Sequence, residues 1–218
     1  MKSLVLKDLY NIGHNARSML FILLILALSL IPSTGVESYI IMSGILCSMM
    51  LITTFSFDDH SKWMKYAMVM PVTRKDIVTS KFIVLLIFSA IGAVTGLVIG
   101  FIGSIILYKA AFNSISSVLN LLFTGLASLV IAEIMGSVSI PLLFRFGAEK
   151  ARILMLVSCL IPAGISFAVY KLFALLGISF SDSSIFILLC FSPLLGLVWN
   201  LLMYKISCGI FEKKELLY

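Results

Sequence analysis

Six long apolar runs dominate the sequence, at residues 19–31, 39–57, 82–108, 118–144, 153–176 and 185–204. About 20 apolar residues in a helix cross the ~30 Å hydrocarbon core of a bilayer. Polar residues do not alternate with apolar ones here, as they do in the strands of a membrane barrel. Because backbone N–H and C=O groups in lipid must be paired within the protein, the runs predict helices. We therefore predict an all-α integral membrane protein, a six-transmembrane-helix bundle forming one domain over residues 1–218.

The composition excludes a soluble globular protein. Of the 218 residues, 61% are hydrophobic and 12% are charged, and the mean hydropathy is +1.16. A soluble domain carries about 25% charged residues. Since this chain has too few charges to cover a globule in water, lipid must solvate most of its side chains.

The lysines and arginines are divided unequally between the two sides that six crossings create. One side receives 14 of the 16, namely Lys2, Lys7, Arg17, Lys62, Lys65, Arg74, Lys75, Lys81, Arg145, Lys150, Arg152, Lys205, Lys213 and Lys214. The other side receives Lys109 and Lys171. Cytoplasmic connections carry the excess of basic residues, so both termini are predicted to be cytoplasmic, including the tail at residues 205–218. This bias explains the net charge of +6 without a nucleic-acid partner.

Residues 1–17 are predicted to form an amphipathic helix at the membrane interface. Apolar and polar positions separate into two faces, with Leu4, Leu6, Leu9 and Ile12 on one side and Lys7, Asp8, Asn11 and Asn15 on the other. The alternative is that this stretch and residues 19–31 form a cleaved signal peptide. The stretch is too long and too ordered for the charged region of such a peptide, which favours an uncleaved helix.

Motifs for catalysis and metal binding are missing from the sequence. It contains no GxxxxGK[ST] phosphate-binding loop, no HExxH, no GxSxG and no GxGxxG. The two histidines are His14 and His60, and the four cysteines show no metal-ligand spacing. We therefore expect no enzyme activity, no metal and no cofactor in this chain.

The connection at residues 58–81 carries the clearest local signals. Asp58 or Asp59 is predicted to cap a short helix, whose apolar stripe consists of Trp63, Tyr66, Ala67 and Met70 and which ends at Pro71. Thr73-x-x-Asp76 is a capping box that opens a second helix running into the apolar run at 82–108. The connection is therefore either a passive helix on the lipid headgroups or a rigid lever on which a cytoplasmic partner acts.

Two features stand out inside the apolar runs. Glu133 lies about halfway along the run at 118–144, where an ionisable group must face protein or water. It is either a hydrogen-bonded link between helices or part of the lining of a substrate path. Gly92, Gly96 and Gly100 place small residues on one helix face, which permits close helix packing.

Three segments resemble bacterial ABC-2-type transporter permeases, which are six-span membrane subunits. The first is the run Trp63…Tyr66…Pro71-Val72-x-Arg74-x-x-Ile77-Val78-x-x-Lys81. The second is the turn at 145–152 with its Phe-Gly-x-Glu-Lys-x-Arg pattern, and the third is the opening Leu6-Lys7-Asp8-Leu9. The topology matches over the whole chain, whereas the motifs cover roughly a fifth of it.

The resemblance implies the permease subunit of an exporter in the bacterial plasma membrane. ATP and Mg would bind to a separate cytoplasmic ATPase, and two permeases, identical or paralogous, would assemble with two ATPases. The residues that match the family's ATPase contacts are Trp63, Tyr66, Met70, Arg74, Lys75, Gly147, Glu149, Lys150 and Arg152. The subgroup exports amphipathic substrates such as phenol-soluble modulins and antimicrobial peptides. The alternatives are a secondary transporter and a peptide-immunity or sensor subunit.

Overall fold

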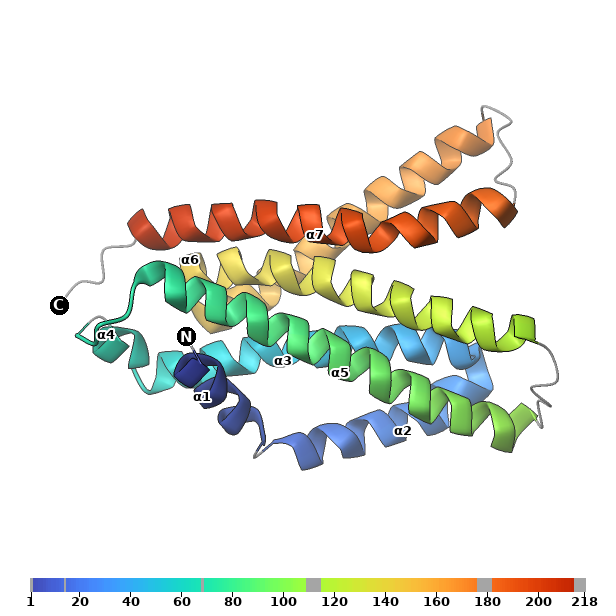
Figure 1. The fold of residues 1–218 in the computed structure, drawn as a ribbon, viewed down its shortest axis with the longest axis horizontal. Helices are drawn as coiled ribbons and strands as arrows, with labels where there is room; N and C mark the ends of the chain where they lie inside the picture. Colours follow the sequence, from blue (N-terminus) through green and yellow to red (C-terminus); the bar gives the residue numbers. More distant parts are fainter. Residues whose placement is uncertain (1, 14, 68, 109–114, 176–181, 214–218) are drawn as a thin grey trace.

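The computed structural model describes residues 2–13, 15–67, 69–108, 115–175 and 182–213. Within these ranges, the side chains of 107–108, 115–117, 149, 151–170, 172–175 and 182–191 lie outside the description. The described residues fold into seven helices (Figure 1), which are α1 (Lys2–Gly13), α2 (Ala16–Thr34), α3 (Val36–His60), α4 (Trp63–Ala67), α5 (Arg74–Tyr108), α6 (Ile115–Leu175) and α7 (Asp182–Lys213). The predicted all-helical class is confirmed.

Helix α6 consists of two helices joined at Gly147. The backbone there has φ 78° and ψ 171°, in a region that residues with a Cβ rarely adopt. The glycine breaks the helix without an intervening loop, so the chain changes direction between residues 146 and 148.

Five helical segments in the described part of the chain are long and apolar enough to cross a membrane. They are Ala16–Thr34, Val36–His60, Arg74–Ile106, Val118–Ala148 and Ser192–Lys213. The predicted span at 153–176 falls on residues whose side chains, apart from that of Lys171, are outside the description, although the backbone of 153–175 is helical. The count of six therefore stays a prediction.

The connection at 58–81 differs from its prediction. Asp58 and Asp59 belong to the last turn of α3, and the next helix begins only at Trp63 and has five residues. Lys62, two residues beyond the end of α3, has a left-handed φ of 51°, a conformation that stops an α-helix. The prediction that an aspartate caps the short helix is therefore wrong, because both side chains bind elsewhere.

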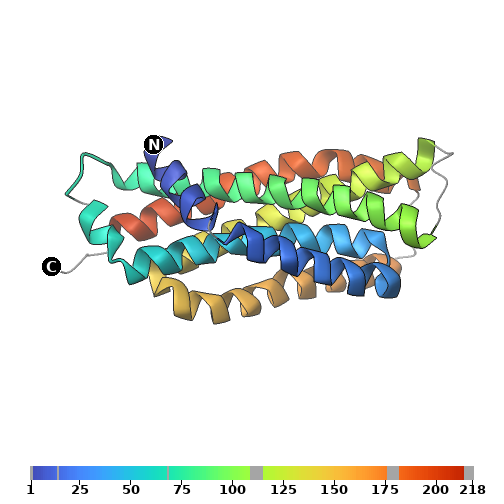
Figure 2. The same cartoon turned by 90° about the horizontal axis from the view of Figure 1, so that it is seen from below.

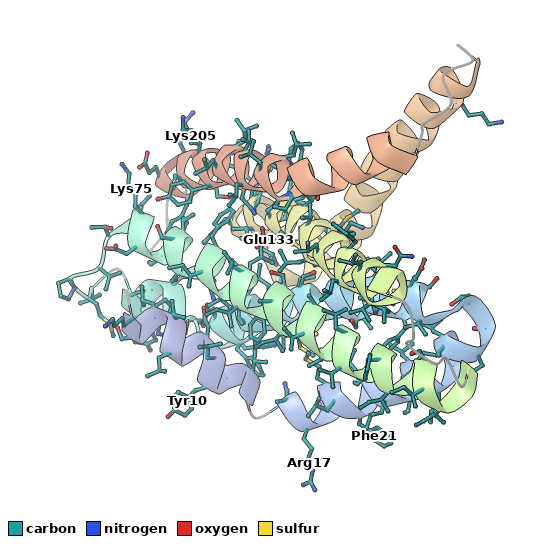
Figure 3. All side chains as sticks on the ribbon, turned by 45° about the vertical axis from the view of Figure 1, so that its right-hand side comes forward. Tyr10, Arg17, Phe21, Lys75, Glu133 and Lys205 are labelled. Atoms are coloured by element: carbon teal, nitrogen blue, oxygen red, sulfur yellow. The ribbon has the colours of Figure 1, made fainter. Side chains whose placement is uncertain are left out.

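Helix α3 is the centre of the bundle and packs along α5 and α6. Seen from below, α2 lies on the outer face of the bundle (Figure 2). Its exposed side includes Phe21, which points away from the other helices (Figure 3). This arrangement leaves α2 free to contact lipid or another protein chain.

The glycine face of α5 lies against α3. A Cβ at Gly92 would lie 2.7 Å from the Cβ of Cys47 and 2.9 Å from the Cα of Gly44. The Ser43 hydroxyl donates a hydrogen bond to the Gly92 carbonyl, with an O···O distance of 3.0 Å. Gly96 and Gly100 continue the contact toward Val36 and Ile40. The small residues thus serve contact between two helices of the same chain.

Gly92→Ala is expected to destabilise the protein by about 1–3 kcal/mol, the usual cost of overpacking a tight contact. Gly209→Ala in α7 is the matched control, because no atom of the described part of the chain lies within 4 Å of a Cβ built there. Unfolding in detergent, followed by circular dichroism, measures both variants. Equal stability of the two variants would contradict the packing.

Candidate functional site

Four parts of the chain meet at one end of the bundle, which we call the basic end. They are α1, α4, the break at Gly147 and the C-terminal end of α7 (Figure 1). The Asp59 carboxylate accepts a hydrogen bond from the Ala148 N–H at 2.9 Å. It therefore caps the second helix within α6 and binds the Gly147 turn to the end of α3.

Arg74 joins the start of α5 to the end of α7. Its guanidinium donates hydrogen bonds to the carbonyl oxygens of Phe211 at 2.9 Å and Glu212 at 2.6 Å. These carbonyls belong to the last turn of a helix, where a cation satisfies unpaired acceptors and the negative end of the helix dipole. Arg74, predicted to contact a partner, thus has a structural role within the chain.

A buried ionic cluster lies beneath this end of the bundle. The Lys81 ammonium lies 2.8 Å from an Asp8 carboxylate oxygen and 2.7 Å from an Asp58 carboxylate oxygen. The three side chains are only 1%, 1% and 2% exposed, respectively. Lys7 binds the second oxygen of each carboxylate. Two lysines and two aspartates therefore neutralise one another and join α1, α3 and α5.

Aromatic rings enclose the two lysines of the ionic cluster. The Lys7 ammonium lies 3.6 Å from the ring centroid of Trp63, and the Lys81 ammonium lies 4.6 Å from that of Phe55. Both distances suit a cation–π interaction. Phe55 in turn packs edge-to-face on Phe144, with ring centroids 5.0 Å apart. The cluster is therefore continuous with the apolar core of the basic end.

The predicted capping box at the start of α5 is present. The Asp76 carboxylate accepts a hydrogen bond from the Thr73 N–H at 3.1 Å, and the Asp76 N–H donates to the Thr73 hydroxyl at 3.2 Å. From Arg74 the helix continues without a break to Tyr108. The connection after α4 is therefore joined rigidly to a membrane-spanning helix.

The predicted apolar stripe of α4 is divided between two faces. Trp63 and Ala67 point inward to the core, whereas Tyr66 and Met70 point outward and are 65% and 51% exposed. Val69, which the stripe omitted, is 86% exposed. A helix of five residues is too short for the predicted periodicity to continue to Met70. Tyr66, Val69 and Met70 form what we call the tip patch, and Lys65 and Lys75 beside them in sequence are also exposed.

The remaining predicted contact residues lie on or near the Gly147 turn. Lys150 is exposed. The side chains of Glu149 and Arg152 are outside the description. The hydrogen bond from Ala148 to Asp59 places this turn beside the end of α3 that leads into α4. Because both predicted contact segments meet at the end of α3, they belong to one end of the molecule.

Glu133 lies deep in the bundle, among α5, α6 and α7 (Figure 3). Its carboxylate accepts hydrogen bonds from the Asn200 amide at 2.8 Å and from the Ser89 hydroxyl at 3.5 Å. These contacts form a hydrogen-bonded link between helices, which is one of the two roles predicted for Glu133. Among the described residues no group of three or more potential metal ligands occurs.

These features define a helical membrane protein whose basic end offers an exposed patch on a rigid support. Residues 3–212 match the family described as ABC-2 family transporter protein, and the chain belongs to this family. No curated protein and no solved structure matches the chain. This family is a membrane component of transporters.

Lys81→Met is expected to destabilise the protein by about 3–5 kcal/mol, because it leaves two buried carboxylates with one remaining lysine. Lys75→Met, which removes an exposed lysine six residues earlier in the same helix, is expected to change stability by less than about 0.5 kcal/mol. Unfolding in detergent compares the two. A Lys81→Met protein as stable as Lys75→Met would show that the cluster contributes nothing.

Proposed function

We propose that this chain is the permease subunit of an ATP-binding cassette exporter, driven by a separate ATPase. The observation that carries the proposal is the tip patch. Tyr66, Val69 and Met70 expose apolar surface just before the start of α5. Aromatic and methionine side chains of this kind are enriched in the cores of protein interfaces, and nothing in the described part of the chain covers them.

The basic end is proposed to face the cytoplasm. Its loops carry the excess of lysine and arginine that marks the cytoplasmic side of membrane proteins. An ATPase uses cytoplasmic ATP, so its docking surface must lie on that side. Charge bias and the location of the tip patch therefore agree on one orientation in a bacterial plasma membrane.

Force is proposed to enter the membrane through α5. The ATPase biases the permease only through its different affinities for two shapes, so the docked surface must be fixed to the moving element. The capping box fixes the start of α5, and the ionic cluster holds α5 to α1 and α3 through Lys81. Movement of the tip patch would therefore shift these helices together as a rigid body.

The proposed substrate is an amphipathic or hydrophobic molecule, such as a cytolytic or antimicrobial peptide. The working assembly would contain two permeases, identical or paralogous, and two ATPases, because facing bundles can form a cleft with apolar walls. The 16 phenylalanines and 11 methionines of the chain offer adaptable apolar surface for varied substrates. An immunity or sensor subunit would bind such peptides without moving them, which a transport assay distinguishes.

Tyr66→Ala combined with Met70→Ala is expected to weaken ATPase association roughly 30-fold, because truncating a central aromatic anchor costs about 2 kcal/mol or more. Trp63→Ala is a poorer test, since Trp63 packs on Lys7 and the core. Co-purification and titration of the ATPase measure the change.

Tyr10→Ala is the matched control for this experiment. Tyr10 is a 74% exposed tyrosine of α1 outside the tip patch (Figure 3). We expect the ATPase to bind this variant as it binds the unaltered chain. If the Tyr66/Met70 variant retains full affinity, α4 and its connection are a passive interfacial segment.

Glu133→Gln is expected to fold normally yet reduce export of a cationic peptide, if Glu133 supplies charge to the substrate path. Glutamine keeps the size and one acceptor oxygen, which can still accept from the Asn200 amide, while its NH2 group can donate to the Ser89 hydroxyl. Glu133→Leu leaves the buried amide without this acceptor and is expected to cost about 1–3 kcal/mol. Peptide efflux and stability are measured together. Normal export by Glu133→Gln would leave Glu133 only its structural link.

A further inference from the structure

A groove at the basic end lies between α6 and α7. It has a volume of about 570 Å³, and the described residues that line it are Arg145, Ile206, Gly209, Ile210 and Lys213. None of these residues is acidic, and in the described part of the chain neither cation forms an ion pair. The groove thus combines two cationic side chains with apolar walls, and none of its described lining residues belongs to the tip patch or the ionic cluster.

The apolar surface of α7 leads directly into this groove. Leu195, Leu202 and Ile206 are exposed, and with Gly209 and Lys213 they repeat at intervals of seven, four, three and four residues. This spacing places them on one face of the helix. The face is apolar within the candidate span Ser192–Lys213 and ends in a cation. Its apolar part suits an acyl chain, and the cation at its end suits an anionic headgroup.

Gly209 creates the space beside the cations. No atom in the described part of the chain lies within 4 Å of a Cβ built at this position. A larger side chain would therefore enter the groove instead of the protein core. The helix can carry such a side chain without a change in its backbone, because Gly209 does not have a left-handed φ.

We propose that this groove binds the phosphate of an anionic phospholipid, with an acyl chain along the apolar face of α7. Arg145 and Lys213 supply the positive charge that a phosphodiester requires, and basic pockets between membrane helices are suited to such headgroups. A free anion would not need the apolar face. A second copy seated symmetrically on this groove would bring like charges together, so the charge pattern favours a lipid.

Native mass spectrometry of the full chain in detergent tests the proposal, with phosphatidylglycerol and phosphatidylcholine of identical acyl chains as probes. We expect preferential binding of phosphatidylglycerol. Arg145→Gln combined with Lys213→Gln should weaken that binding roughly 30-fold, since each basic residue near an anionic membrane contributes on the order of 1 kcal/mol. Gly209→Leu should abolish it without changing the charge.

Lys75→Gln combined with Lys205→Gln is the matched control, because both lysines project from the basic end outside the groove (Figure 3). We expect this pair to bind phosphatidylglycerol within twofold of the unaltered chain. An equal loss in this pair would overturn the proposal, because the attraction would then be a diffuse surface charge. Full binding by both groove variants would also overturn it.

Two further outcomes would show that the groove has a different occupant. Displacement of the lipid by millimolar inorganic phosphate would show that the groove recognises a free anion, and the proposal would fail. Cross-linking between two copies through a cysteine replacing Ile206 would show an interface between permeases, and the proposal would fail as well. Because these measurements use the permease without its ATPase, their failure leaves the proposed coupling function unaffected.

Discussion

The fold of the basic end depends on the mutual neutralisation of four charges, three of which lie almost out of contact with water while the fourth, Lys7, is partly exposed. Removing an ion from water costs several kcal/mol even after the protein relaxes, so Lys81, Asp8 and Asp58 are tolerated only while paired. Each carboxylate binds both Lys7 and Lys81. Loss of Lys81 would leave two buried carboxylates with only the partly exposed Lys7 as their partner. The cluster therefore fixes α1, α3 and α5 relative to one another.

Polar side chains also satisfy the backbone groups at two helix ends of the basic end. Asp59 satisfies the first turn after Gly147, and Arg74 satisfies the last turn of α7. Adjacent residues thus have different tasks, since Asp58 holds α5 while Asp59 holds α6. Deeper in the bundle, contact between α3 and α5 relies on small residues, because lipid offers no hydrophobic drive for helix association. Electrostatics fixes one end of the bundle and close packing fixes its middle.

Local patterns in the sequence predicted the helices and their start signals, because apolar length and capping act over a few residues. The capping box of Thr73 and Asp76 is such a signal. The pairing of Lys81 with Asp8 and Asp58 was not predicted, because it joins residues that are distant in sequence and the lysine was counted only as a topological charge. The division of the apolar stripe between two faces, with Trp63 and Ala67 turned inward, was not predicted, because a helix that begins at Trp63 has only five residues. The position of Lys81 directly before an apolar run is the sequence signal that could have indicated a buried partner.

The central claim is that this bundle converts the shape change of a separate ATPase into movement of substrate. Reconstitution in liposomes tests it most directly, with the permease alone and with the ATPase that co-purifies with it. We expect efflux of amphipathic peptide only when the ATPase and ATP are both present on the side of the basic end. Full-rate movement by this chain alone, without ATP, would contradict it and would indicate a secondary transporter.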